Sequence, residues 1–278
     1  MPIHDQGYRR YGGHRRVTGT AWWVIARQQM RNVITQKRYI ALLLLAWAPF
    51  VGRVGQIYLA ANFQQASFLA TSAQLFRGFL DQQGLFVFLL IVGSSGAIAD
   101  DRRANALQVY LSKPLTRVEY IAGKLFAPLA FVLGITLLPA LLLLVVHVAF
   151  AGSLTFVTQN LYLLPAILLY SIAQALVGTF TMVALSSLSK SRRFTALTFT
   201  GLFFFTTAMY QALSRITGSQ LWALISPRDM LTVIGDAAFR MPGPRALPLW
   251  AALLGVAVIV GASVLVLERR IRGVEVVK

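Results

Sequence analysis

Residues whose side chains could perform chemistry are few in this chain of 278 residues. Nine acidic residues, three His and no Cys are present, so disulfides, thiolate metal sites and thiolate catalysis are excluded. There is no HExxH or GxSxG pattern, and His147 stands alone in an apolar run, as a structural His does. Gly123-Lys124 lacks the upstream glycine and the following Ser or Thr of a phosphate-binding loop. The sequence therefore predicts no catalytic, metal or cofactor site in this chain.

The composition indicates that the elements holding these residues lie in a membrane. Hydrophobic residues make up 57% of the chain and charged residues 13%, whereas soluble domains have about 25% charged residues. Several runs reach the roughly 20 apolar residues that a bilayer crossing needs. We therefore predict an all-α polytopic membrane protein. Its net charge of +17 is concentrated in the N-terminal tail and alternate loops, which favours contacts with anionic membrane lipids over nucleic-acid binding.

The predicted membrane domain, residues 39–272, follows two N-terminal segments and precedes a short tail, residues 273–278. Residues 1–19 are basic and are predicted to be disordered. Residues 20–38 form an interfacial amphipathic helix, because Trp22 and Ala26 lie opposite Arg27 and Arg31. Six crossings are predicted, at residues 39–61, 83–99, 125–150, 161–188, 194–213 and 249–267.

Two connections on the predicted outer side differ in character. Residues 62–83 are predicted to be a polar outer connection that contains Arg77 and Asp81. Residues 214–246 are too long and too apolar for a plain loop. Within them, Ser226-Pro227-Arg228-Asp229 has the N-cap, first-turn proline and carboxylate of a helix start. We therefore expect a re-entrant helical segment before the sixth crossing.

The distribution of basic residues predicts the orientation of the chain. Six crossings place both termini on one side, where the termini and connections carry twenty Lys and Arg residues, against five on the other. Arg53 lies within the first crossing. Because connections rich in Lys and Arg stay in the cytoplasm, both termini are predicted to be cytoplasmic in the plasma or inner membrane.

The stretch between the second and third crossings, residues 98–124, is polar and yet helical in pattern. Asp100 and Asp101 are predicted to cap a helix start, and Pro114 to end that helix by restricting Lys113. Thr116-Arg117-Val118-Glu119 has the capping-box pattern that opens the next helix. A short amphipathic helix held by defined caps is typical of a docking element.

Ionisable residues deep in the membrane would indicate a carrier with its own energy source. No acidic residue lies deep within a predicted crossing, whereas proton- and sodium-coupled carriers generally need ionisable residues or broken helices at mid-membrane. We therefore expect energy for transport to come from a partner, and the cytoplasmic stretch 98–124 is the natural place to receive it.

The same stretch resembles the permease subunit of ABC transporters of the type-2 exporter family, the six-helix class also described as type V. In that family an acidic residue ends the second crossing and is followed by a small residue–Leu pair, a Leu, a Pro, a Ser/Thr-Arg pair and a Gly-Lys pair. The matching residues here are Asp100 or Asp101, Ala106-Leu107, Leu111, Pro114-Leu115, Thr116-Arg117 and Gly123-Lys124. Asp and Asn105 replace the family's usual Glu and Gly. The layout is similar over residues 20–272, and the Ser226-Pro227 pair also resembles a family feature.

The resemblance implies that residues 101–113 are a coupling helix seated in a groove of a separate cytoplasmic ATPase. ATP and Mg would bind that ATPase, and two permease copies, as a homodimer, would combine with two ATPases. The residues expected to dock are Asp100, Asp101, Arg102, Arg103, Leu107, Gln108, Tyr110, Leu111, Lys113 and Pro114.

The resemblance also implies that the second and fifth crossings line the transport path. The residues expected there are Phe86, Phe88, Leu89, Phe203, Phe204 and Met209. These apolar side chains favour a hydrophobic or amphipathic cargo. Two other functions fit the pattern: a secondary carrier or channel that works without ATP, and a membrane anchor or regulator that does not transport.

Overall fold

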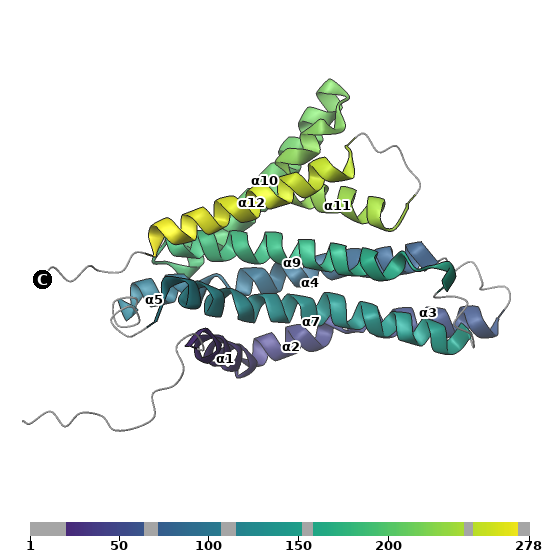
Figure 1. Ribbon diagram of the computed structural model, residues 1–278, viewed down its shortest axis with the longest axis horizontal. Helices are drawn as coiled ribbons and strands as arrows, with labels where there is room; N and C mark the ends of the chain where they lie inside the picture. Colours follow the sequence, from purple (N-terminus) through teal and green to yellow (C-terminus); the bar gives the residue numbers. More distant parts are fainter. Residues whose placement is uncertain (1–20, 64–71, 107–114, 152–157, 242–246, 272–278) are drawn as a thin grey trace, which may run out of the picture.

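The computed structural model describes residues 21–63, 72–106, 115–151, 158–241 and 247–271, and its elements there are helices (Figure 1). The prediction that the coupling helix covers residues 101–113 lies partly outside these residues, since 107–114 are not described. The helices are α1 (Ala21–Ile34), α2 (Lys37–Ala46), α3 (Ala48–Asn62), α4 (Ser72–Gly93), α5 (Gly96–Arg103), α7 (Arg117–Ala151), α9 (Leu163–Leu188), α10 (Arg192–Thr217), the 3₁₀ helix η2 (Gln220–Ile225), α11 (Pro227–Ala238) and α12 (Leu249–Arg270).

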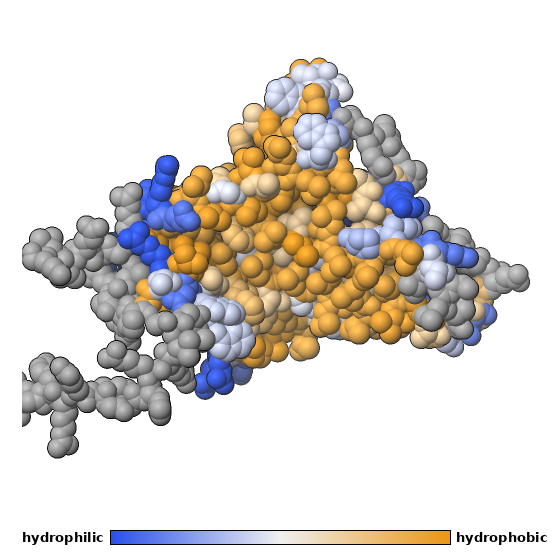
Figure 2. All heavy atoms as spheres, viewed as in Figure 1, coloured by the Kyte–Doolittle hydropathy of each residue, from blue (hydrophilic) through white to orange (hydrophobic). Residues whose placement is uncertain are grey.

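Six stretches of the described chain are long and apolar enough to cross a membrane, which confirms the predicted fold class. They are Lys37–Asn62, Ala73–Arg103, Arg117–Phe150, Leu163–Leu188, Arg192–Thr217 and Leu249–Arg270. Figure 2 shows hydrophobic residues over the middle of the visible face and hydrophilic residues gathered at its two ends. The chain is therefore a multi-pass membrane protein.

Helix α9 forms the centre of the bundle. It packs against α4, α5, α7, α10, α11 and α12, and it is apolar around its whole circumference, as a buried helix should be. Many of its buried residues are small, among them Ala173, Gly178 and Ser186, and small residues let membrane helices approach closely. In contrast, α10 diverges from the bundle (Figure 1) and exposes Leu197 and Phe205.

The first crossing is broken at Trp47, between α2 and α3. Pro49 lies in the first turn of α3, where its missing N–H is tolerated. The break leaves the Ala46 carbonyl without a helical partner, and the buried Gln83 side chain of α4 donates to this oxygen from Nε2 at 2.9 Å. A side-chain donor from a neighbouring helix thus satisfies the backbone at the break.

Helix α1 packs closely against α7. A Cβ atom on Gly123 would lie 2.8 Å from both the Trp22 carbonyl oxygen and Ile25 Cβ, so the glycine permits the crossing. Ala26 is fully buried while Arg27 is exposed, in agreement with the predicted amphipathic pattern.

The second crossing begins earlier than predicted. Residues 62–83 were expected to be a polar connection, but α4 already begins at Ser72 and holds Arg77 and Asp81. Arg77 is tolerated in this helix because ion pairs satisfy its charge. In the outer segment, by contrast, the predicted helix start at Ser226 is confirmed: α11 begins at Pro227, and Ser226 Oγ accepts a hydrogen bond from the Asp229 N–H at 3.3 Å. Burial raises the pKa of the Asp229 carboxyl.

Candidate functional site

The predicted docking segment is approached through a turn at Ser94 and Ser95 that separates α4 from α5. The first backbone N–H groups of a helix have no partner within it, and here a side chain from α9 supplies one. Ser186 Oγ accepts hydrogen bonds from the Ile98 N–H at 3.0 Å and the Ala99 N–H at 2.9 Å. The same hydroxyl donates to the Ser95 carbonyl at 2.7 Å. One fully buried serine of α9 therefore fixes the start of α5.

A buried ion pair fixes the other end of α5. The Asp101 carboxylate lies 2.6 Å from Lys124 Nζ and also accepts a hydrogen bond from the Tyr120 hydroxyl at 2.6 Å, both from α7. The side chains of Lys124 and Asp101 are only 11% and 17% exposed. Charges removed from water to this degree are stable only when paired and hydrogen-bonded.

Two arginines complete the attachment at this end of the bundle. Arg102 Nη1 donates to the Ser187 carbonyl of α9, and Arg192 Nη2, from the start of α10, donates to the Gly93 carbonyl at 2.9 Å. We call Asp101, Arg102, Tyr120, Lys124 and Ser186 the α5 clamp. It joins the end of the second crossing to α7 and α9, and Arg192 joins the same region to α10.

Of the two caps predicted for the docking segment, the one at its start is wrong and the capping box that follows it is confirmed. Asp100 and Asp101 do not begin a helix; they lie in the last two turns of α5, which ends at Arg103. The local sequence favoured a new start after Gly96, but Ser186 from α9 satisfies that start instead. The predicted capping box is confirmed, because the Thr116 N–H donates to Glu119 Oε2 at 2.9 Å and the Glu119 N–H donates to Thr116 Oγ1 at 3.2 Å.

The structure describes only some of the residues that were predicted to dock on the ATPase. Asp100 and Arg103 are exposed, and Asn105 has a φ of 52° in the turn that follows α5, a backbone conformation in which Asn is tolerated. This position corresponds to the usual glycine of the pattern. The remaining predicted residues lie outside the described part of the chain: Leu107, Gln108, Tyr110, Leu111, Lys113 and Pro114.

Three of the predicted path residues, Phe88, Phe203 and Phe204, meet where α4 and α10 approach each other. The Phe88 ring centroid lies 5.2 Å from that of Phe203 and 5.7 Å from that of Phe204, distances typical of aromatic packing. Leu89 and Met209 are exposed, and Phe86 is partly buried in the cluster that includes Phe88. The aromatic residues therefore form a contact between the second and fifth crossings.

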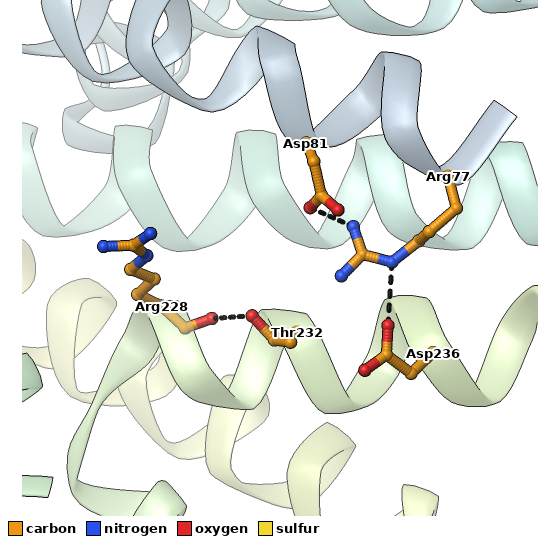
Figure 3. Close-up of polar contacts among 5 residues, drawn as sticks. All are labelled: Arg77, Asp81, Arg228, Thr232 and Asp236. Carbon is orange, nitrogen blue, oxygen red and sulfur yellow. Dashed lines mark hydrogen bonds and ion pairs between the residues drawn. The ribbon is translucent and has the colours of Figure 1, made fainter. Parts of the chain in front are cut away.

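A second polar cluster joins α4 to α11 (Figure 3), and α11 lies away from the α5 end of the bundle (Figure 1). Arg77 of α4, 4% exposed, forms ion pairs with Asp81 and with Asp236 of α11, whose Oδ1 lies 3.0 Å from Arg77 Nε. The guanidinium carbon also lies 4.9 Å from the Tyr170 ring centroid, within the range of a cation–π contact. One buried arginine thus links α4, α9 and α11.

Replacing Arg77 with Met is expected to lower the free energy of unfolding by about 2 kcal/mol, since hydrogen bonds to charged groups are lost while the apolar volume remains. Asp81 and Asp236 are 53% and 43% exposed, so water can solvate the carboxylates left behind. Thermal unfolding of the purified protein in detergent measures the change. Arg228→Met, which removes an exposed arginine of α11 (Figure 3), is the matched control. Equal unfolding temperatures for both variants would contradict the role given to Arg77.

Several clamp residues were absent from the predicted docking set. The sequence pattern does not indicate Tyr120 or Ser186 of the clamp, or Ser187, whose carbonyl accepts from Arg102, and it indicates Lys124 only through the Gly-Lys pair. Ser186-Ser187 is a polar pair that interrupts the apolar run of α9 near its end, and that interruption was the available signal. Nothing in the local sequence indicates that these serines contact α5.

Comparison with known proteins agrees with this architecture. A family model described as ABC-2 family transporter protein matches residues 23–227, which include the α5 clamp and the helices that it joins. No curated protein matches the chain. The match covers most of the 278 residues, so the chain belongs to the ABC-2 transporter family and is a transmembrane permease of that type.

Proposed function

We propose that this permease is part of an ATP-driven exporter and receives its energy from a separate cytoplasmic ATPase docked on residues 101–113. Two permease copies, as a homodimer, would combine with two ATPases. The termini and the α5 end of the bundle would face the cytoplasm of the plasma or inner membrane, as the excess of Lys and Arg on that side favours.

The observation that carries this proposal is the α5 clamp. The proposed docking segment begins within α5, and α5 is tied to α7 by Asp101 and Lys124 and to α9 by Ser186. A displacement of the docked segment would therefore move packed helices rather than a slack loop, because packed interiors transmit strain.

The contact between Arg192 and Gly93 would also transmit movement of the docking segment to α10 and to the proposed path. Arg192 joins the start of α10 to Gly93 at the end of α4, and Phe88 packs against Phe203 farther along the same two helices. Motion at the α5 end would thus change the contact between the second and fifth crossings. The apolar side chains at that contact favour a hydrophobic or amphipathic cargo.

Reconstitution into proteoliposomes tests the energy source. We expect transport to require the partner ATPase and hydrolysable ATP, and to be absent with permease alone. The control is the same vesicles with a non-hydrolysable nucleotide. Full transport by the permease alone would support an ATP-independent carrier or channel instead, and failure of any ATPase to bind would support a membrane anchor.

A further inference from the structure

A cavity of about 410 Å³ lies between α1 and the junction of α4 with α5. This volume is within the range of small-molecule sites, about 300–1,000 Å³. Its floor includes the small residues Gly93, Ser94 and Gly96, and α7 closes one side. The elements that line the cavity meet at the α5 end of the bundle (Figure 1), and hydrophilic residues gather at the ends of the visible face (Figure 2).

The charged groups of the lining leave one anion and one cation for a ligand. Asp101 and Lys124 also line the cavity, but they pair with each other at 2.6 Å. Asp100 has no ion-pair partner among the residues that the structure describes, and Arg192 donates to a backbone carbonyl. Arg192 also interacts with the hydroxyl of Tyr39, which lines the same cavity. A guanidinium has five N–H donors, so Arg192 keeps donors for a further acceptor.

Asp100 and Arg192 lie beside each other without forming an ion pair. A Cβ atom on Gly96 would overlap the Asp100 carboxylate and would lie 3.2 Å from Arg192 Cδ. Gly96 thus leaves room for both side chains at the same place. A carboxylate and an arginine side chain that meet at Gly96, each able to take a further partner, are complementary to a ligand that has an ammonium and a phosphate a few bonds apart.

The rest of the lining is amphipathic. From α1 come the amides of Gln28, Gln29 and Asn32, and Gln29 Oε1 is buried with no hydrogen-bond partner among the described residues. From α4 and α7 come Leu90 and Phe131. A buried amide oxygen without a partner favours a ligand that donates hydrogen bonds, and the apolar side favours one with a hydrocarbon part.

We propose that this cavity binds the phosphoethanolamine head group of a membrane phospholipid. The ammonium donates to Asp100 and toward Gln29 Oε1, the phosphate accepts from Arg192, and the glycerol end lies against Leu90 and Phe131. A choline head group has no N–H donor for Asp100, and a glycerol head group has no positive charge. Binding of the head group at this cavity requires neither ATP nor the proposed ATPase partner.

Native mass spectrometry of the full-length protein, stripped of lipid in detergent, tests this site. The probes are dioleoyl phosphatidylethanolamine, phosphatidylcholine and phosphatidylglycerol, and the chain-free glycerophosphoethanolamine. We expect phosphatidylethanolamine to bind about tenfold more tightly than the other two lipids, because a charge-assisted hydrogen bond distinguishes them. The chain-free compound should bind more weakly still.

Two variants separate the two ends of the head group. Asp100→Asn, at an exposed position, should abolish the preference for phosphatidylethanolamine, and Arg192→Met should weaken phosphatidylethanolamine and phosphatidylglycerol alike. Glu268→Gln makes the same change of charge at an exposed position of α12 and should leave the preference intact. Equal binding of all three lipids, or an undiminished preference in Asp100→Asn, would overturn the proposal. Equally tight binding of glycerophosphoethanolamine would overturn the assignment to a lipid.

Discussion

Replacing Asp101 with Asn is expected to lower the free energy of unfolding by about 3–5 kcal/mol, the usual cost of removing one partner from a buried ion pair. Lys124 would keep its charge in a site where its side chain is only 11% exposed. The Tyr120 hydroxyl would also lose its charged acceptor. Thermal unfolding of the purified permease in detergent gives the change in stability.

A double variant shows whether Asp101→Asn loses stability because Lys124 keeps an unpaired charge or because α5 is disturbed in general. When both members of a buried ion pair are replaced by apolar residues of similar size, the effect on stability is often small or favourable. We therefore expect Asp101→Leu combined with Lys124→Met to recover most of the stability that Asp101→Asn loses. If the double variant is less stable than the single one, the ion pair is not what holds the end of α5.

The functional effect of Asp101→Asn follows from the position of the pair. Asp101 is the first residue of the proposed docking segment, and Lys124 belongs to α7, which runs the length of the bundle. Without the pair, the segment would move without moving α7. ATP-driven transport should therefore fall more than binding of the ATPase, which a pull-down measures separately. If the variant binds less ATPase but transports normally for each ATPase that is bound, this explanation is wrong.

Features that depend on neighbouring residues in the sequence could be predicted. Apolar runs predicted the six crossings, and the capping box at Thr116 and the N-cap at Ser226 are where the local pattern indicated. These features need only the periodicity of a helix and the hydrogen bonds of its first turn.

Features that depend on distant residues could not be predicted. Helix α4 begins early and includes Arg77, whose charge is paired with Asp236, 159 residues away in sequence. The position of Asp101 at the end of α5 depends on Ser186, whose hydroxyl takes the place of a local cap. In both cases a tertiary partner satisfies a charge or a backbone group that the local sequence leaves unsatisfied, so only the folded chain shows the helix boundary.

Replacing Leu111 with Asp is expected to abolish ATP-driven transport while the protein still inserts into the membrane. Leu111 lies outside the described residues, and its role as an apolar anchor in a groove of the ATPase comes from the sequence pattern. Central anchors of an interface contribute about 2–4 kcal/mol, and a buried carboxylate without a partner adds to that loss. Binding of the ATPase should therefore weaken by about a hundredfold or more.

The measurements are ATPase binding by pull-down and ATP-driven transport in proteoliposomes, with thermal unfolding as the test of folding. Val118→Asp is the matched control, because Val118 is 72% exposed in the first turn of α7, where a carboxylate is favoured by the helix dipole. We expect this control to bind and transport normally. Because Leu111 is not one of the α5 clamp residues, we expect the stability of Leu111→Asp to equal that of the unchanged protein, in contrast to Asp101→Asn. If Leu111→Asp binds the ATPase and transports normally, residues 101–113 are not the docking segment, even though the α5 clamp would remain a structural feature of the permease.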